Sequence, residues 1–189
     1  MGIFDFSKKK PIKQTSDFSM LIYNELNYIT SYCINQNLDI NNCNQNVLAV
    51  LSENIGMIYL STAIVNLYHY GLIKEGDKLV KDTKLWVKQI CSRKPQYKEA
   101  LQKVYDFVKL FERNLNPDNE EKTIDNWRIW IEEILSRPNK ASVGKVATLF
   151  RVGALYDERK MTNELLKHIT KTRDIIIKAY KEEHGKSFA

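Results

Sequence analysis

The sequence predicts an all-α protein, and three observations carry that prediction. Glycine and proline together supply only 11 of 189 residues, about half of their usual share, which leaves few sites for the tight turns of an all-β fold. Apolar residues recur at spacings of three and four along most of the chain, the spacing that lines one face of an α-helix. An alternating apolar pattern of useful strand length does not occur. We therefore expect about seven helices in one bundle or irregular stack over residues 16–189, after a flexible basic segment at 1–15.

The first two expected helices differ in character. The helix at about 17–35 has one apolar face, which includes Phe18, Leu26 and Cys33, and an Asn-rich loop follows it. The helix at about 47–70 is apolar on all sides, which is typical of the centre of a bundle or of a membrane span. Glu53 lies within it, and a charge inside a bilayer costs several kcal/mol. We therefore expect a buried central helix and no integral membrane insertion.

The remaining expected helices are amphipathic. They cover about 75–91, 95–111, 118–135, 142–155 and 162–180, and Pro138 is expected to begin a break between the third and fourth of these. Ser142 and Thr162 are expected caps of the last two. The expected inward-facing side chains include Leu79, Thr83, Val87, Leu101, Val104, Phe111, Ile124, Trp127, Ile131, Ile134, Leu165, Ile169, Thr172 and Ile176.

Charge is distributed unevenly along the chain, which has a net charge of +6. Residues 1–13 carry +3, residues 74–189 carry +7, and residues 14–73 contain neither lysine nor arginine and carry −4. A segment of this length without cations is either largely buried or presents a neutral-to-acidic face to another molecule. Codon bias in an AT-rich genome is the alternative cause, because many asparagines fill the same segment.

Cysteine usage and the first residues bear on location. Cys33, Cys43 and Cys91 are odd in number and lack metal-type spacing, which favours a reducing, cytoplasmic compartment. Apolar residues precede a lysine cluster within residues 2–10, an order that allows weak peripheral contact with an anionic membrane. Packing of this segment onto the domain is the alternative interpretation.

One stretch carries a family resemblance. In the segment 70–85, Gly71, Glu75 and Gly76 match a glycine, an acidic residue and a small residue in the middle of a tetratricopeptide repeat, although Ile73 stands where that family has an aromatic. A second similar stretch, 97–101, follows after 24 residues instead of the ~34 of the family period. The region at about 55–91 thus resembles one such helical hairpin. The resemblance implies two helices packed closely at the two glycines, in a protein that binds other proteins.

The sequence contains no complete motif for catalysis or cofactor binding. Gly144 and Lys145 lack the first glycine and the following Ser or Thr of a phosphate-binding loop, and the three histidines are far apart. Glu53 is the strongest catalytic candidate because an apolar helix desolvates it, with a buried structural acid as the alternative. No base or nucleophile accompanies it. We therefore expect no enzyme activity, no cofactor and no metal.

The expected function is binding. We expect a helical module that occludes a partner protein, as an inhibitor, an adaptor or an immunity-type protein. Two surfaces are candidates: the cation-free face of the first two helices with possible aromatic anchors, and a basic face suited to an acidic partner. Nucleic-acid binding through the basic face at 137–151 is the alternative function, and a second copy of the chain is an alternative partner. The candidate partner-binding residues are Tyr23, Tyr28, Tyr32, Trp130, Arg137, Lys140, Lys145 and Arg151.

Overall fold

The computed structural model contains six helices and describes residues 18–38, 45–90, 94–150 and 156–184, without the side chains at 89–90, 94–95, 139–150 and 182–184. The helices are α1 (Phe18–Asn35), α2 (Gln45–His69), α3 (Ile73–Ile90), α4 (Lys94–Arg113), α5 (Glu120–Phe150) and α6 (Glu158–His184). Within these ranges no strand occurs, so the all-α prediction is confirmed there. The expected basic segment at 1–15, Cys43, Cys91 and Arg151 lie outside the described residues.

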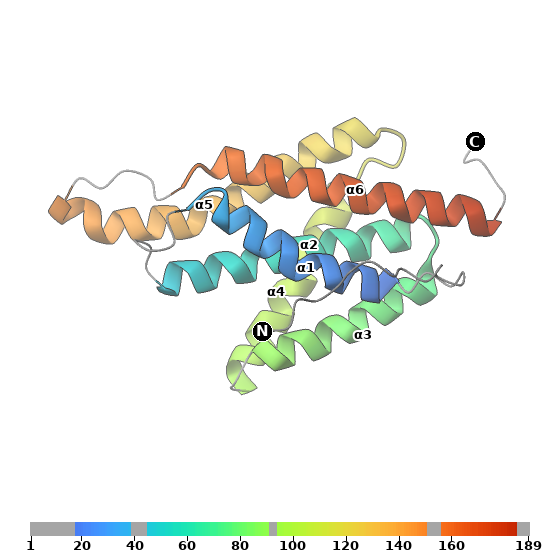
Figure 1. Cartoon of the computed structure of the whole chain (residues 1–189), viewed down its shortest axis with the longest axis horizontal. Helices are drawn as coiled ribbons and strands as arrows, with labels where there is room; N and C mark the ends of the chain where they lie inside the picture. The colour runs from blue at the N-terminus through green and yellow to red at the C-terminus, as the bar shows by residue number, and fades with distance from the viewer. Residues whose placement is uncertain (1–17, 39–44, 91–93, 151–155, 185–189) are drawn as a thin grey trace, which may run out of the picture.

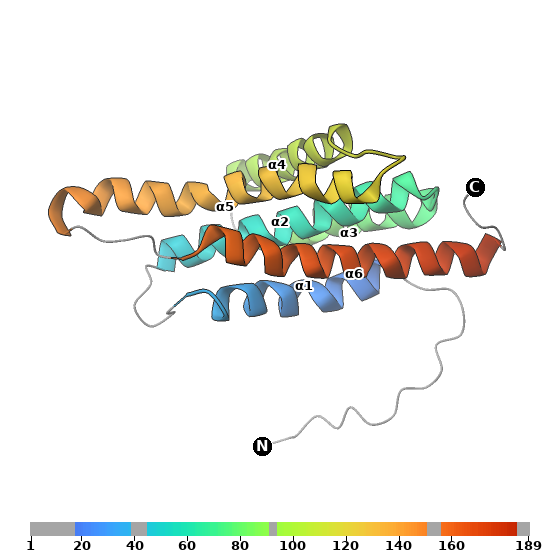
Figure 2. The same ribbon diagram turned by 90° about the horizontal axis from the view of Figure 1, so that it is seen from above.

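Helix α2 lies at the centre of the bundle and packs against all five other helices. In Figure 2 it lies between α4 on one side and α1 on the other. Every residue from Asn54 to Leu67 is buried, which explains why this helix has no polar face. By length and composition α2 could also cross a membrane, but 72% of its most apolar window is buried inside the protein. The expected buried central helix is confirmed.

Two buried polar side chains of α2, Tyr59 and Ser61, find partners on neighbouring helices. The Tyr59 hydroxyl lies 2.7 Å from Oγ1 of Thr172 on α6, and the Ser61 hydroxyl donates to the Val104 carbonyl on α4 over 3.3 Å. Burial raises the pKa of Tyr59 to about 12, although the hydrogen bond with Thr172 acts in the opposite direction. Because buried polar groups are costly without partners, these bonds favour one rotational setting of α2.

Trp127 joins α5 to α4. Its ring is fully buried and meets Phe111 edge-to-face, with 5.6 Å between ring centroids. Its indole Nε1–H donates to the Phe111 carbonyl over 2.9 Å. The apolar periodicity of the sequence correctly placed both residues in the core. The other described residues expected to face inward are likewise buried or half-buried.

The expected break at Pro138 is wrong. Helix α5 continues through Pro138 to Phe150, so the described residues form six helices where the sequence predicted about seven. Proline removes one backbone donor and crowds the preceding turn of a helix. In that turn the Tyr156 hydroxyl, from outside the helix, donates to the Leu135 carbonyl over 2.5 Å. Pro138 itself is buried, so packing also holds this part of α5 in place.

The expected cap of α6 is also wrong. Asp157 caps this helix, because its Oδ1 accepts a hydrogen bond from the Lys160 backbone N–H over 3.0 Å. Thr162 instead lies inside the helix and is buried. Likewise Ser142 lies within α5, which continues past it, so no helix begins there.

Helices α2 and α3 form the hairpin that resembled a tetratricopeptide repeat. Gly71 connects them with a φ of 75°, a left-handed conformation that suits glycine. A Cβ at Gly76 would lie 2.9 Å from the Tyr68 ring, so the ring packs directly on the α3 backbone. Membership of the family stays a prediction.

Candidate partner-binding groove

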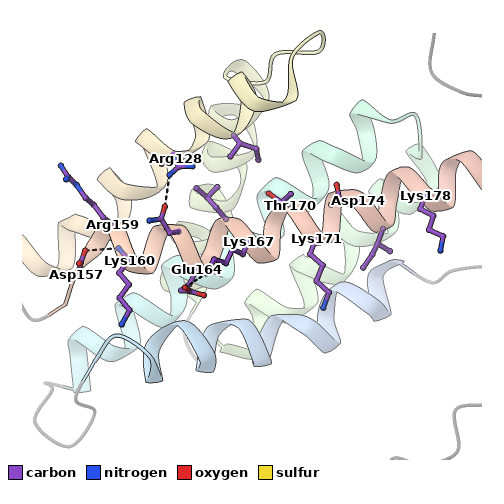
Figure 3. A pocket seen from close by; sticks show the side chains of 14 residues that line it. Arg128, Asp157, Arg159, Lys160, Glu164, Lys167, Thr170, Lys171, Asp174 and Lys178 are labelled. Atoms are coloured by element: carbon purple, nitrogen blue, oxygen red, sulfur yellow. Dashed lines mark hydrogen bonds and ion pairs between the residues drawn. The ribbon is translucent and has the colours of Figure 1, made fainter.

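A groove of about 1170 Å³ runs between α5 and α6 (Figure 3). Its apolar lining includes Ile124, Leu166 and Ile175, while its polar lining is dominated by cations. Six lysines and arginines face three acids, which leaves an excess of three positive charges. The charged lining residues are Arg128, Arg159, Lys160, Lys167, Lys171 and Lys178, with Asp157, Glu164 and Asp174.

Most of the cations come from one face of α6. We call this face the lysine stripe; it comprises Lys160, Glu164, Lys167, Lys171, Asp174, Lys178 and Lys181. Successive members are separated alternately by four and three residues, so they lie above one another along the helix. At 1.5 Å per residue the stripe is about 31 Å long. Figure 3 shows Lys160, Lys171 and Lys178 in succession along α6.

Several groove cations are held in place by neighbours. The Lys167 ammonium donates to Glu164 over 2.8 Å, and this hydrogen bond raises the pKa of Lys167. Arg128 donates to the Asn163 side chain over 3.0 Å, across the groove from α5 to α6. Lys171, by contrast, makes no ion pair with any residue that the structure describes. The groove thus presents oriented positive charge above an apolar floor.

An aromatic cluster borders the lysine stripe where α1 meets α6. Tyr28 and Tyr32 stack with 5.7 Å between ring centroids, and both meet His168 edge-on at 5.9 and 5.6 Å. Tyr28 is 55% exposed. Burial lowers the pKa of His168, with Lys171 acting in the same direction and Glu25 opposing it. Two of the three predicted tyrosines are therefore brought together next to cations.

Tyr23 is placed elsewhere. It is half-buried and packs against the core near α3, and burial raises its pKa to about 12. A half-buried tyrosine of this kind contributes to packing between α1 and α3. It lies outside the aromatic cluster formed by Tyr28, Tyr32 and His168.

The predicted basic face at 137–151 is described only in part. Arg137 pairs with Glu133 at 3.7 Å and borders a shallow depression shared with α4. Trp130 is 37% exposed, and the side chains of Lys140 and Lys145 are not described. Sequence reasoning missed the lysine stripe of α6. Its alternating spacing of four and three was the signal that could have revealed it.

Glu53, the catalytic candidate, is an ion-pair partner in the structure. Its carboxylate accepts a hydrogen bond from the Lys103 ammonium over 3.2 Å, and its side chain is 36% exposed. The pair joins α2 to α4 near the surface. Across the described part of the chain, no group of three or more His, Cys, Asp or Glu residues could hold a metal ion.

Comparison of the chain with protein-family models, with curated proteins and with solved structures returns no match. What the chain binds is therefore inferred from its own surface.

Proposed function

We propose that this chain is a non-enzymatic helical module that binds an acidic segment of a partner protein in the α5–α6 groove. It acts as an inhibitor, adaptor or immunity-type protein by covering that segment. The observation that supports this function is the groove itself, where six cations and three acids surround an apolar lining. Such a lining complements an amphipathic segment whose apolar side chains are flanked by acids.

The length of the lysine stripe suggests the form of the partner segment. A helix that matches about 31 Å contains about 20 residues. Its apolar side chains, repeated every three or four residues, would contact Ile124, Leu166 and Ile175. Its carboxylates would lie opposite Lys171 and Lys178. Opposite charges across such an interface mainly accelerate association and select the partner.

A pull-down from native cells tests this function, with a charge-reversed variant and a matched control. Lys171→Glu with Lys178→Glu reverses two charges of the lysine stripe, seven residues apart. Lys81→Glu with Lys88→Glu makes the same change at the same spacing on the exposed face of α3. We expect a stoichiometric acidic protein to be recovered with the unmodified chain and with the α3 variant, and to be lost with the α6 variant. Equal recovery with both variants would contradict the proposed groove.

Nucleic-acid binding is the second candidate function, and the stacked Tyr28 and Tyr32 favour it. Exposed aromatics beside lysines are the elements that hold single-stranded nucleic acid. Nuclease treatment during the same pull-down separates the two functions. Loss of all partners after digestion, with a steep decrease of affinity in salt, would favour nucleic acid over a protein partner.

A further inference from the structure

A second concave site, separate from the groove, lies among α2, α3 and α4. It is a half-enclosed pocket of about 190 Å³, and its walls are almost wholly apolar. Ile64 from α2 and Val104 from α4 are buried at its base. The half-buried apolar side chains that complete the walls are Val80, Leu101 and Val108.

Two polar groups of this pocket, the hydroxyls of Thr83 and Tyr68, already have partners within the protein. The Thr83 hydroxyl donates to the Leu79 carbonyl over 2.7 Å, and the Tyr68 hydroxyl donates to Asp77 over 2.8 Å. Tyr68 is also held by its close packing on Gly76. A ligand in this pocket would therefore gain mainly apolar contact and ring packing.

The rim supplies one distinctive charge. The Lys84 ammonium lies over the Tyr105 ring, 5.9 Å from its centroid, and pairs with no carboxylate among the described residues. Asp77, the acid at the Tyr68 end, lies seven residues before Lys84 on α3, which is about 10 Å along the helix. The pocket is thus apolar inside, with an available cation at one end.

We propose that this pocket binds small aromatic monocarboxylates, with the ring between α3 and α4 and the carboxylate at Lys84. The size argues for a single ring, because a cavity of about 150 Å³ is sufficient for benzene. The remaining space accommodates a short side chain that reaches the rim. Lys84 favours an anionic end over a neutral or cationic one. This site shares no lining residue with the α5–α6 groove, so either proposal can fail alone.

Methyl NMR of the full chain tests the site, with phenylacetate as the probe. We expect saturable shifts at the methyl groups of Ile64, Val104 and Val108, with a Kd on the order of 1 mM or tighter. Toluene should shift the same methyl groups, and phenethylamine should bind more weakly than phenylacetate. No saturable shift with phenylacetate at about 10 mM, or shifts spread over unrelated methyl groups, would overturn the proposal.

Two substitutions locate the binding. Lys84→Gln should weaken phenylacetate about threefold to fivefold and leave toluene unchanged, whereas Lys81→Gln, an exposed lysine on the same helix, should change neither. Val108→Phe should fill the pocket and abolish binding of both probes. Circular dichroism checks that Val108→Phe folds. If Val108→Phe does not fold, Lys84→Gln still tests the proposal, because it changes an exposed position. Equal phenylacetate affinity in Lys84→Gln and Lys81→Gln would overturn it.

Discussion

At the scale of single residues, the strongest features are buried side chains with one defined polar partner. Trp127 is the clearest example, since its indole fills the space between α4 and α5 and satisfies the Phe111 carbonyl. The helical spacing of apolar residues predicted that Trp127 is buried. The carbonyl that it contacts, 16 residues earlier in the chain, could not be read from that pattern.

Trp127→Phe should lower the free energy of unfolding by about 2 kcal/mol, because it leaves a small cavity and an unsatisfied buried carbonyl. Trp130→Phe, at a partly exposed position on the same helix, should change it by less than about 0.5 kcal/mol. Urea unfolding followed by circular dichroism measures both. Similar losses for the two variants would show that the indole hydrogen bond contributes little.

His168 should make stability depend on pH. Burial lowers its pKa below the ordinary 6.5 in the folded protein, so the unfolded chain binds more protons as the pH falls through 6.5. The free energy of unfolding therefore has its full value above pH 6.5 and decreases below pH 6.5. Urea unfolding between roughly pH 8 and roughly pH 5 should show a smaller decrease for His168→Gln than for the unmodified chain. Identical pH profiles would contradict this role of His168.

At the scale of helices, the predicted ends were wrong in two places. Pro138 and Ser142 wrongly predicted a break and a new helix inside α5, and Thr162 wrongly predicted the cap of α6. At the start of α6 the local cap is Asp157, whereas at Pro138 the helix continues beside a contact from a distant segment, the Tyr156 hydroxyl on the Leu135 carbonyl.

Tyr156→Phe should cost about 1–2 kcal/mol, because the Leu135 carbonyl next to the proline turn loses a buried donor. Tyr28→Phe removes a hydroxyl from an exposed ring and serves as the control. Thermal unfolding should separate the two variants by several degrees. No difference in Tm would indicate that packing alone maintains α5 through Pro138.

Gly71→Ala should destabilise the α2–α3 connection by about 1 kcal/mol, because alanine tolerates a φ of 75° poorly. Gly71→Asn should cost less, since asparagine adopts this region more readily. Urea midpoints of the two variants test the order. A larger loss for asparagine than for alanine would contradict the backbone explanation.

At the scale of the whole molecule, three helices meet at a charged cluster near the end of α2. Arg173 on α6 is nearly buried, with a side chain 10% exposed, and it pairs with Glu120 on α5 at 3.3 Å. The other carboxylate oxygen of Glu120 accepts from the Tyr70 hydroxyl over 3.3 Å. Since Tyr70 follows directly on α2, this cluster connects the central helix to two others.

Glu120→Gln should lower the free energy of unfolding by about 1–2 kcal/mol, because it removes the charge opposite a nearly buried guanidinium. Glu121→Gln is the matched control, since Glu121 is exposed in the same first turn of α5. Both substitutions remove one negative charge from the helix N-terminus, so their difference isolates the cluster. Equal unfolding free energies would show that Arg173 does not depend on Glu120.

The candidate sites were less predictable than the core. Tyr28 and Tyr32 were candidate aromatic anchors on a cation-free face, but their partner His168 lies on α6, more than 130 residues later. The cations of the α5–α6 groove lie on the polar faces of amphipathic helices, and such charged faces are common in helical proteins. These cations line one groove only because α5 and α6 lie side by side (Figure 3). The pocket at Lys84 likewise forms only where α2, α3 and α4 meet.

The helical class, the apolar central helix and most inward-facing residues can be predicted from the sequence alone, because helix periodicity and hydrophobic burial act over a few neighbouring residues. The sequence also showed that residues 14–73 lack cations. Only the tertiary structure showed that α2 is buried and that α1 lies along the lysine-rich α6 (Figure 1). Continuation through Pro138, the groove and the pocket were likewise decided by contacts between distant segments. No local pattern encodes such contacts, because packing chooses which helix faces meet.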